Sequence, residues 1–138
     1  MTSRGDFGAA VSSKMSKTVL VADDKPNVRM LVSATIESDE CEVVEACDGD
    51  EAWQLLQETR PCLAVLDVQM PGMTGIELTR AIREHPELSG TGIILLTAKA
   101  QVKDVEAGTA AGADFYLTKP FEPCDLLALV ERVLAGEG

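Results

Sequence analysis

The sequence predicts an α/β domain in which a doubly wound parallel sheet is covered by helices on both faces. Short apolar runs alternate with segments whose apolar residues recur at helical spacing, and the alternation continues from residue 18 to residue 134. Glycine and proline fall at the junctions between these segments, where turns are expected. Strands that alternate with helices favour right-handed crossovers, and therefore parallel strands.

Five apolar runs are predicted to be strands, because each is short and most are bounded by turn-forming residues. They are TVLVA at 18–22, CEVVEA at 41–46, LAVLD at 63–67, GIILLTA at 92–98 and FYLT at 115–118. The segments between and after them have apolar residues on one helical face. In chain order these residues are Val28, Leu31, Val32 and Ile36; Ala52, Leu55 and Leu56; Leu78, Ala81 and Ile82; Val102 and Val105; and Leu126, Leu129, Val130, Val133 and Leu134.

The composition of the runs also predicts the order of the strands. The runs at 19–22, 63–66 and 93–96 are almost wholly apolar, as strands buried on both faces are. The second run contains Glu42 and Glu45, and the fifth run is short, so both are expected at the edges of the sheet. This assignment is compatible with the order 2-1-3-4-5, whose crevice lies at the carboxyl ends of the strands, where strands one and three diverge.

Length and charge limit the kinds of protein that this chain can be. Its 138 residues fit one domain, and we expect a flexible tail at 1–16 followed by the domain at 17–138. The formal net charge of −11 argues against direct binding of nucleic acid or of an anionic membrane, since both are polyanions. Residues 1–16 lack the apolar run of a secretory signal, and no segment reaches the ~18 apolar residues of a membrane span.

The cysteines and the only histidine are expected to have no catalytic role. The cysteines are scattered, with no CxxC pair and no histidine nearby, which argues against zinc ligation and against a disulfide framework. We expect reduced core thiols in a cytoplasmic protein. His85 is predicted to be an exposed residue at a helix end, just before Pro86. The cysteines are Cys41, Cys47, Cys62 and Cys124.

Polar residues gather at the carboxyl ends of the predicted strands. Asp23 and Asp24 follow the first strand, Asp67 ends the third, Thr97 ends the fourth and Lys119 follows the fifth. Because these ends open on one side of a parallel sheet, three carboxylates, a hydroxyl and an ammonium are expected to converge. An aspartate after a strand is commonly only a turn former or a helix cap, but three aspartates that converge at strand ends indicate a site.

The chemistry of this set indicates a magnesium-dependent phosphoacceptor. Carboxylates, backbone carbonyls and water make a hard oxygen site that suits Mg²⁺, and the cation would offset the repulsion between adjacent aspartates. A carboxylate can also act as a nucleophile toward phosphorus and form an acyl phosphate. The metal and Lys119 would then neutralise the phosphoryl oxygens, while the Thr97 hydroxyl would donate a hydrogen bond to one of them.

The motifs VADDK, LAVLDVQMPGMTGIEL, IILLTA and AGADFYLTKPF, taken in this order, resemble those of response-regulator receiver domains. These domains are the phosphoacceptor modules of two-component signalling. The resemblance covers residue 17 to about residue 135 and implies a flavodoxin-like (βα)5 fold. It implies that Asp67 is the phosphoacceptor and that Asp24 binds Mg²⁺ directly, with Asp23 acting through water. The backbone carbonyl of Gln69 would complete the protein ligands.

The resemblance also implies roles for residues of the fourth and fifth strands. Thr97 and Lys119 would contact the phosphoryl group, and Tyr116 would be an aromatic switch residue that responds to movement of Thr97. The peptide bond between Lys119 and Pro120 would be cis. We further expect Lys99 to lie beside the path of the hydrolysing water, opposite Gln69, and to slow loss of the phosphoryl group.

Three functional classes are compared. The resemblance favours a signalling phosphoacceptor, with weak autophosphatase activity, that receives its phosphoryl group from a histidine kinase or a histidine phosphotransfer protein. Its downstream protein target would bind the surface of the fourth helix, fifth strand and fifth helix. A haloacid-dehalogenase-type phosphohydrolase is disfavoured, because Gln69 stands where that family usually has a second acidic residue. A receiver-like module that is never phosphorylated typically lacks one of the acidic residues or the lysine, whereas this chain has all of them. The sequence leaves open whether the chain acts alone or belongs to a longer protein.

Overall fold

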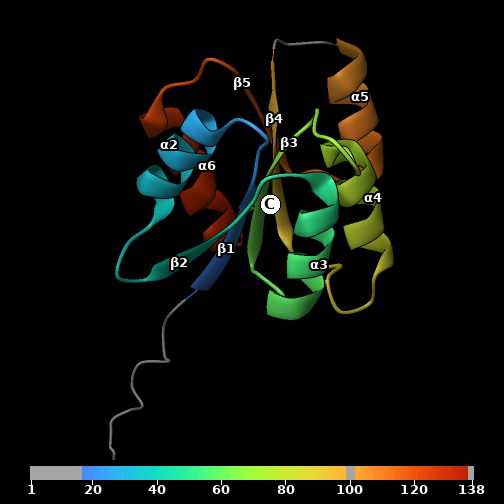
Figure 1. Cartoon of the computed structure of the whole chain (residues 1–138), viewed down its shortest axis with the longest axis horizontal. Helices are drawn as coiled ribbons and strands as arrows, with labels where there is room; N and C mark the ends of the chain where they lie inside the picture. Colours follow the sequence, from blue (N-terminus) through green and yellow to red (C-terminus); the bar gives the residue numbers. More distant parts are fainter. Residues whose placement is uncertain (1–16, 99–101, 137–138) are drawn as a thin grey trace, which may run out of the picture.

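The structure is a computed structural model that describes residues 17–98 and 102–136 (Figure 1). The tail expected at 1–16 and the residue Lys99 lie outside this part of the chain. Strands and helices alternate along it without exception, as predicted. The elements are β1 (Lys17–Ala22), α2 (Pro26–Ile36), β2 (Cys41–Ala46), α3 (Gly49–Thr59), β3 (Leu63–Asp67), α4 (Gly75–Glu84), β4 (Gly92–Thr97), α5 (Val102–Ala111), β5 (Phe115–Thr118) and α6 (Pro123–Leu134).

The five strands form one parallel sheet in the predicted order, β2-β1-β3-β4-β5. The strand with two glutamates and the shortest strand occupy the two edges, and Glu42 and Glu45 are exposed there. The three central strands are buried because helices cover both of their faces. Their composition therefore predicted the order correctly.

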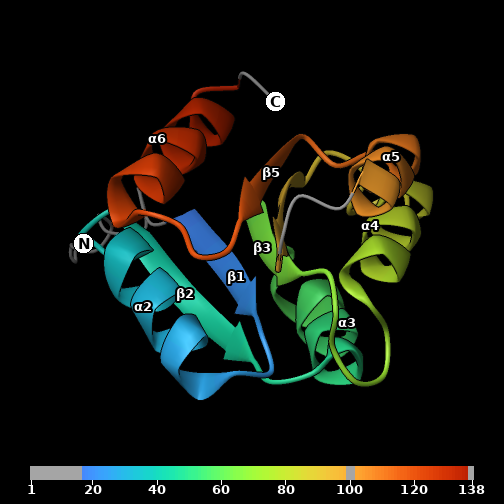
Figure 2. The same ribbon diagram turned by 90° about the horizontal axis from the view of Figure 1, so that it is seen from above.

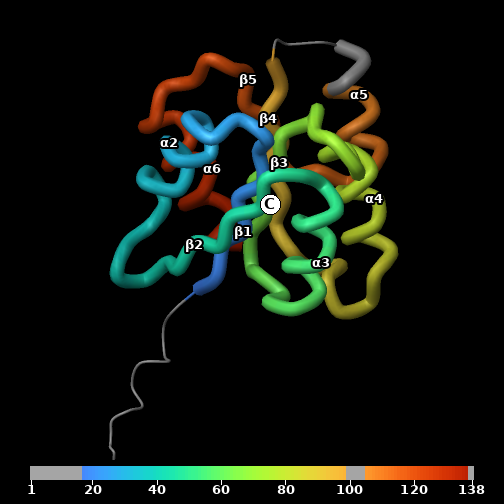
Figure 3. The backbone as a smooth tube through the Cα atoms, viewed as in Figure 1, coloured from blue at the N-terminus to red at the C-terminus, as the bar shows by residue number. Residues whose placement is uncertain are grey.

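Helices α2 and α6 cover one face of the sheet, and α3, α4 and α5 cover the other (Figures 1 and 2). The side chains of β1 alternate between the two layers, as the period of a strand requires. Leu20 and Ala22 pack in the core under α3 and α4, whereas Val19 and Val21 pack in the core under α2 and α6. The carboxyl ends of the strands lie together at the upper end of the molecule in Figure 3.

Two predictions about isolated side chains need correction. Only Cys41 is a buried thiol, while Cys47, Cys62 and Cys124 are exposed, because they lie in a turn, before a strand and in the first turn of α6. All four cysteines are free. His85 ends α4 as predicted but is half-buried, since its ring packs edge-on against Trp53 with centroids 6.0 Å apart. No helix in the described part of the chain is long and apolar enough to cross a membrane.

Candidate phosphoacceptor site

Three carboxylates meet at the carboxyl ends of β1 and β3, as the sequence predicted. Asp23 and Asp24 follow β1, Asp67 ends β3, and one carboxylate oxygen from each lies within 4.8 Å of the others. Asp23 and Asp67 are buried, whereas the Asp24 side chain is 33% exposed. The register of the sheet causes this convergence, because β1 and β3 are neighbouring parallel strands that end at the same level.

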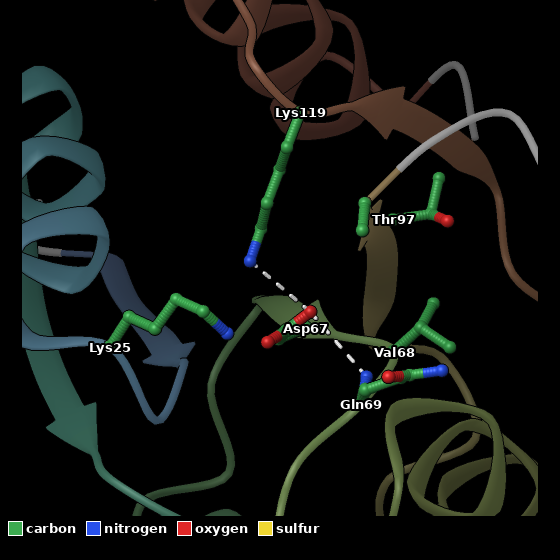
Figure 4. A pocket seen from close by; sticks show the side chains of 7 residues that line it. Lys25, Asp67, Val68, Gln69, Thr97 and Lys119 are labelled. Carbon is green, nitrogen blue, oxygen red and sulfur yellow. Dashed lines mark hydrogen bonds and ion pairs between the residues drawn. The ribbon is translucent and has the colours of Figure 1, made fainter.

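Lys119 balances part of this negative charge. It follows β5, yet its ammonium lies 3.0 Å from Asp23 Oδ2 and 3.3 Å from Asp67 Oδ1. Figure 4 shows the Lys119 side chain extending from above toward the Asp67 carboxylate. The peptide bond between Lys119 and Pro120 is cis, as predicted.

Asp67 is held in an environment that disfavours its charged form. Burial, followed by the negative charge of Asp23, raises the pKa of the Asp67 carboxyl, and the nearby Lys119 offsets only part of this effect. The backbone N–H of Gln69 lies 3.4 Å from Asp67 Oδ1 and is only a weak donor at that distance. Among the described residues, Asp67 Oδ2 has no hydrogen-bond partner.

A pocket of about 120 Å³ opens in front of Asp67 (Figure 4). Gln69 and Thr97 line it, and so do Val68 and Ala98. Thr97 is buried at the end of β4. In Figure 4 its hydroxyl points away from the Asp67 carboxylate, so contact with a group on Asp67 would require rotation of the side chain.

Tyr116 lies on β5 next to Leu95 of β4, in the layer under α5. Its hydroxyl donates a hydrogen bond to the carbonyl of Val105 at 2.8 Å and lies 2.7 Å from Thr109 Oγ1. Both partners belong to α5. The ring packs where Gly108 has no side chain, because a Cβ there would come within 2.8 Å of the ring and of the hydroxyl. The predicted switch residue therefore connects β5 to α5.

Two residues that support the site were not identified from the sequence. Arg29 of α2 donates a hydrogen bond to the carbonyl of Asp23 at 2.8 Å and another to Glu45 of β2 at 3.0 Å, which holds the loop after β1 against the edge strand. Gly75, the first residue of α4, packs directly on Asp67, where a Cβ would lie 2.4 Å from the backbone oxygen. Arg29 lies outside the motifs quoted above, and Gly75 lies within LAVLDVQMPGMTGIEL but was assigned no role there. Only the folded chain shows what each residue contacts at the site.

The donor set fits a hard divalent cation. Asp24 Oδ1 and Asp67 Oδ2 are buried oxygens without a hydrogen-bond partner in the described part of the chain, and both belong to the converging triad. Orphaned carboxylate oxygens are costly in a protein interior unless a cation or a donor satisfies them. Oxygen ligands of this kind suit Mg²⁺.

The fold and the pocket define a doubly wound α/β domain with an acidic site at the point where β1 and β3 diverge. The family model of the response regulator receiver domain matches residues 19–131, so the chain belongs to this family. This match decides against the haloacid-dehalogenase alternative. The fold is shared with the chemotaxis response regulator CheY4 of Vibrio cholerae, with a TM-score of 0.80 and 37% sequence identity over 86% of this chain and 99% of that one.

Longer proteins match the same region. The response regulator DrrB of Thermotoga maritima aligns with a TM-score of 0.79 and 36% identity over 89% of this chain and 54% of that chain. The DNA-binding response regulator MtrA of Mycolicibacterium smegmatis is 37% identical over 120 residues, which are 87% of this chain and 51% of that protein. The chain spans about half the length of the curated relatives it matches. The DNA-binding description therefore belongs to MtrA as a whole protein.

Proposed function

We propose that this receiver domain takes a phosphoryl group onto Asp67 in a magnesium-dependent reaction, from a histidine kinase or a histidine phosphotransfer protein. The observation that carries the proposal is the environment of Asp67. Its carboxylate is buried, lies 3.3 Å from the Lys119 ammonium, and has an unpartnered oxygen beside two further carboxylates. A buried nucleophile at the rim of a small pocket is suited to attack on an incoming phosphorus atom.

In the proposed transfer, a carboxylate oxygen of Asp67 forms a bond to phosphorus while the bond from phosphorus to the histidine nitrogen breaks. The nitrogen keeps the electron pair, takes up a proton from water and leaves as neutral imidazole. Lys119, whose ammonium lies 3.3 Å from Asp67 Oδ1, would contact one phosphoryl oxygen, and Thr97 would donate to another after its side chain rotates. Slow attack of water on phosphorus would later break the bond to Asp67, release inorganic phosphate and restore the carboxylate.

The residues that would hold Mg²⁺ are Asp24 and Asp67 directly, Asp23 through water, and the backbone carbonyl of Gln69. When bound, the cation supplies positive charge that neutralises the phosphoryl oxygens. Asp24 Oδ1 and Asp67 Oδ2, which accept no hydrogen bond from the described residues, support this assignment. We also propose a cytoplasmic location, where free thiols such as the four in this chain remain reduced.

The proposed output surface consists of α5, β5 and α6, which are the fourth helix, fifth strand and fifth helix of the domain. The contacts of Tyr116 support this choice, because its hydroxyl ties β5 to α5 through Val105 and Thr109. Rotation of Thr97 toward a phosphoryl group would change the packing behind β4 and allow Tyr116 to move. Phosphorylation then needs only to favour one of two existing arrangements, which a protein target distinguishes.

The chemistry is tested by incubating the protein with acetyl phosphate and Mg²⁺ and measuring the intact mass. We expect one phosphoryl group on the wild type, none on Asp67→Asn, and none when EDTA removes the metal. Asp39→Asn makes the same chemical change at an exposed turn and should be labelled like the wild type. Full labelling of Asp67→Asn would overturn the assignment of the phosphoacceptor. No labelling of the wild type would favour the interaction module that is never phosphorylated.

The readout is tested with Thr97→Ala. This variant should still accept a phosphoryl group on Asp67, but beryllofluoride should cause smaller NMR shift changes in β5 and α5 than it does in the wild type. Changes as large as those of the wild type would show that the signal does not pass through Thr97.

A further inference from the structure

The acidic pocket contains a second lysine that the proposed chemistry has not used. Lys25 lines the pocket together with Asp67, Gln69, Thr97 and Lys119. Its ammonium lies 3.5 Å from Asp24 Oδ1, and in Figure 4 it points toward the Asp67 carboxylate from the left, whereas Lys119 approaches from above. A surface lysine usually extends into solvent. The Lys25 side chain is 60% exposed, yet its ammonium lies at the acidic pocket, so this placement needs a physical reason.

The backbone fixes where this side chain begins. The N–H of Lys25 donates to Asp23 Oδ1 at 2.9 Å, which closes a short turn after β1. Pro26 follows directly and restricts Lys25 to the extended conformation that it has, with φ −99° and ψ 114°. The Cα of Lys25 is therefore held at the rim of the pocket by constraints on both sides.

Lysine is a poor residue for this position if only the helix is considered. Lys25 is the N-cap of α2, yet its side chain makes no capping hydrogen bond, and the first turn of α2 contains no acidic residue. An N-cap is normally Ser, Thr, Asp, Asn or Gly, and a cation at a helix N-terminus opposes the helix dipole. A residue that destabilises the helix to which it belongs, as Lys25 does for α2, is typical of positions that serve a functional site.

The carboxylate that contacts Lys25 is also the proposed direct ligand of the metal. Asp24 Oδ1 has no hydrogen-bond partner among the described residues, so the ion pair with Lys25 is the interaction that a bound cation would replace. Once Asp24 is committed to the metal, the ammonium of Lys25 loses this partner. It still lines the pocket that Asp67 lines, where a phosphoryl group would bring new negative charge.

We propose that Lys25 is an exchangeable cation of the phosphoacceptor pocket: it pairs with Asp24 before the metal binds, and with the phosphoryl group afterwards. The inference rests on the proposed phosphorylation of Asp67. It predicts two effects of opposite sign from one charge. Lys25 weakens the binding of Mg²⁺, because the metal must displace it from Asp24. Lys25 also speeds phosphorylation, because it neutralises charge on the incoming phosphoryl oxygens together with Lys119.

The test compares Lys25→Met and Lys25→Arg with the wild type in two measurements on the full chain. The first is the affinity for Mg²⁺, from a titration followed by amide NMR shifts without any phosphodonor. The second is the rate constant for phosphorylation by acetyl phosphate at saturating Mg²⁺. Lys25→Met should bind Mg²⁺ about two- to fivefold more tightly, as expected for loss of a solvent-exposed ion pair. Its phosphorylation should be about three- to tenfold slower.

Two control variants separate this mechanism from other effects. Lys25→Arg keeps the charge and should stay within about twofold of the wild type in both measurements. Lys17→Met removes the same charge at the far end of β1, about 20 Å away along a strand of six residues, where salt screens its field. This variant should change neither quantity.

Opposite shifts in Lys25→Met support the proposal, because a variant that merely damaged the pocket would lose both metal affinity and rate. The proposal is overturned if Lys25→Met binds Mg²⁺ no more tightly than the wild type, or if its phosphorylation is no slower. Absence of phosphorylation in the wild type would instead refute the function proposed for Asp67, since the behaviour of the variants is not needed for that conclusion.

Discussion

Replacing Asp67 by Asn should make the metal-free protein more stable, although Asp67 is the residue at the centre of the proposed function. The three carboxylates have ligand atoms within 4.8 Å of one another. Two unit charges at that separation repel by about 3.5 kcal/mol at an effective dielectric constant of ~20. Lys119 lies 3.3 Å from Asp67 and cancels part of this repulsion. We therefore expect Asp67→Asn to raise the free energy of unfolding by about 1–2 kcal/mol.

The variant leaves Lys119 with a partner, because its ammonium remains 3.0 Å from Asp23 Oδ2. The assay is urea unfolding in EDTA. With a slope of about 1.5 kcal/mol per M, the midpoint should rise by about 1 M. Asp39→Asn, at an exposed turn, should change stability by less than about 0.5 kcal/mol. A metal-free Asp67→Asn protein that is less stable than the wild type would refute the argument.

The raised pKa of Asp67 determines how the stability of the metal-free protein depends on pH. The pKa of Asp67 is raised in the folded protein, so the folded state holds this proton more tightly than the unfolded state does. The free energy of unfolding of the wild type therefore falls as the pH rises from the ordinary aspartate pKa through the raised pKa of Asp67. Above the raised pKa, the full loss of stability is present. The advantage of Asp67→Asn should accordingly fade as the pH falls through this window.

Magnesium should reduce the same advantage. A ligand that binds only the folded state stabilises it by about 2.7 kcal/mol at a hundredfold excess over its Kd. The wild type offers three carboxylates to the cation and Asp67→Asn offers two, so the wild type should gain more. If Mg²⁺ stabilises both proteins equally, Asp67 is not a metal ligand.

Two further predictions concern residues that support the site. Gly75→Ala should destabilise the protein by about 1–3 kcal/mol and weaken Mg²⁺ binding, because its Cβ would lie 2.4 Å from the backbone oxygen of Asp67 and the backbone would have to shift. Gly90→Ala, where a Cβ meets nothing within 4 Å, is the matched control in urea unfolding, and equal stability of the two variants would contradict the reasoning. Arg29→Met should lower stability by about 1 kcal/mol and also weaken Mg²⁺ binding, since the bond to the carbonyl of Asp23 is lost. An unchanged Mg²⁺ titration would show that the loop after β1 holds its position without Arg29.

The sequence alone predicted the architecture and most of the residues in the pocket. Hydrophobic periodicity predicted each strand and helix, because burial on one or two faces leaves a period of two, a period near 3.6, or a continuous apolar run. The glutamates of β2 and the shortness of β5 predicted the edges of the sheet. Parallel strands end at one side, so the positions of Asp23, Asp67 and Lys119 along the chain were enough to predict that they meet.

Only the tertiary structure showed what holds those residues in place and what else faces them. The contact of Arg29 with the carbonyl of Asp23 depends on the angle at which α2 crosses the sheet, and the contact of Gly75 with Asp67 depends on the path of the loop between β3 and α4. The sequence predicted four core thiols, but three are exposed, since a small apolar residue in a turn or a first helical turn need not face the core. Lys25 directly follows Asp23 and Asp24 in the sequence. A lysine side chain is long and rotates freely, however, so the sequence does not predict where its ammonium lies. Its direction toward the pocket was decided by the turn at Asp23, by Pro26 and by the field of the carboxylates, which exist together only in the folded chain.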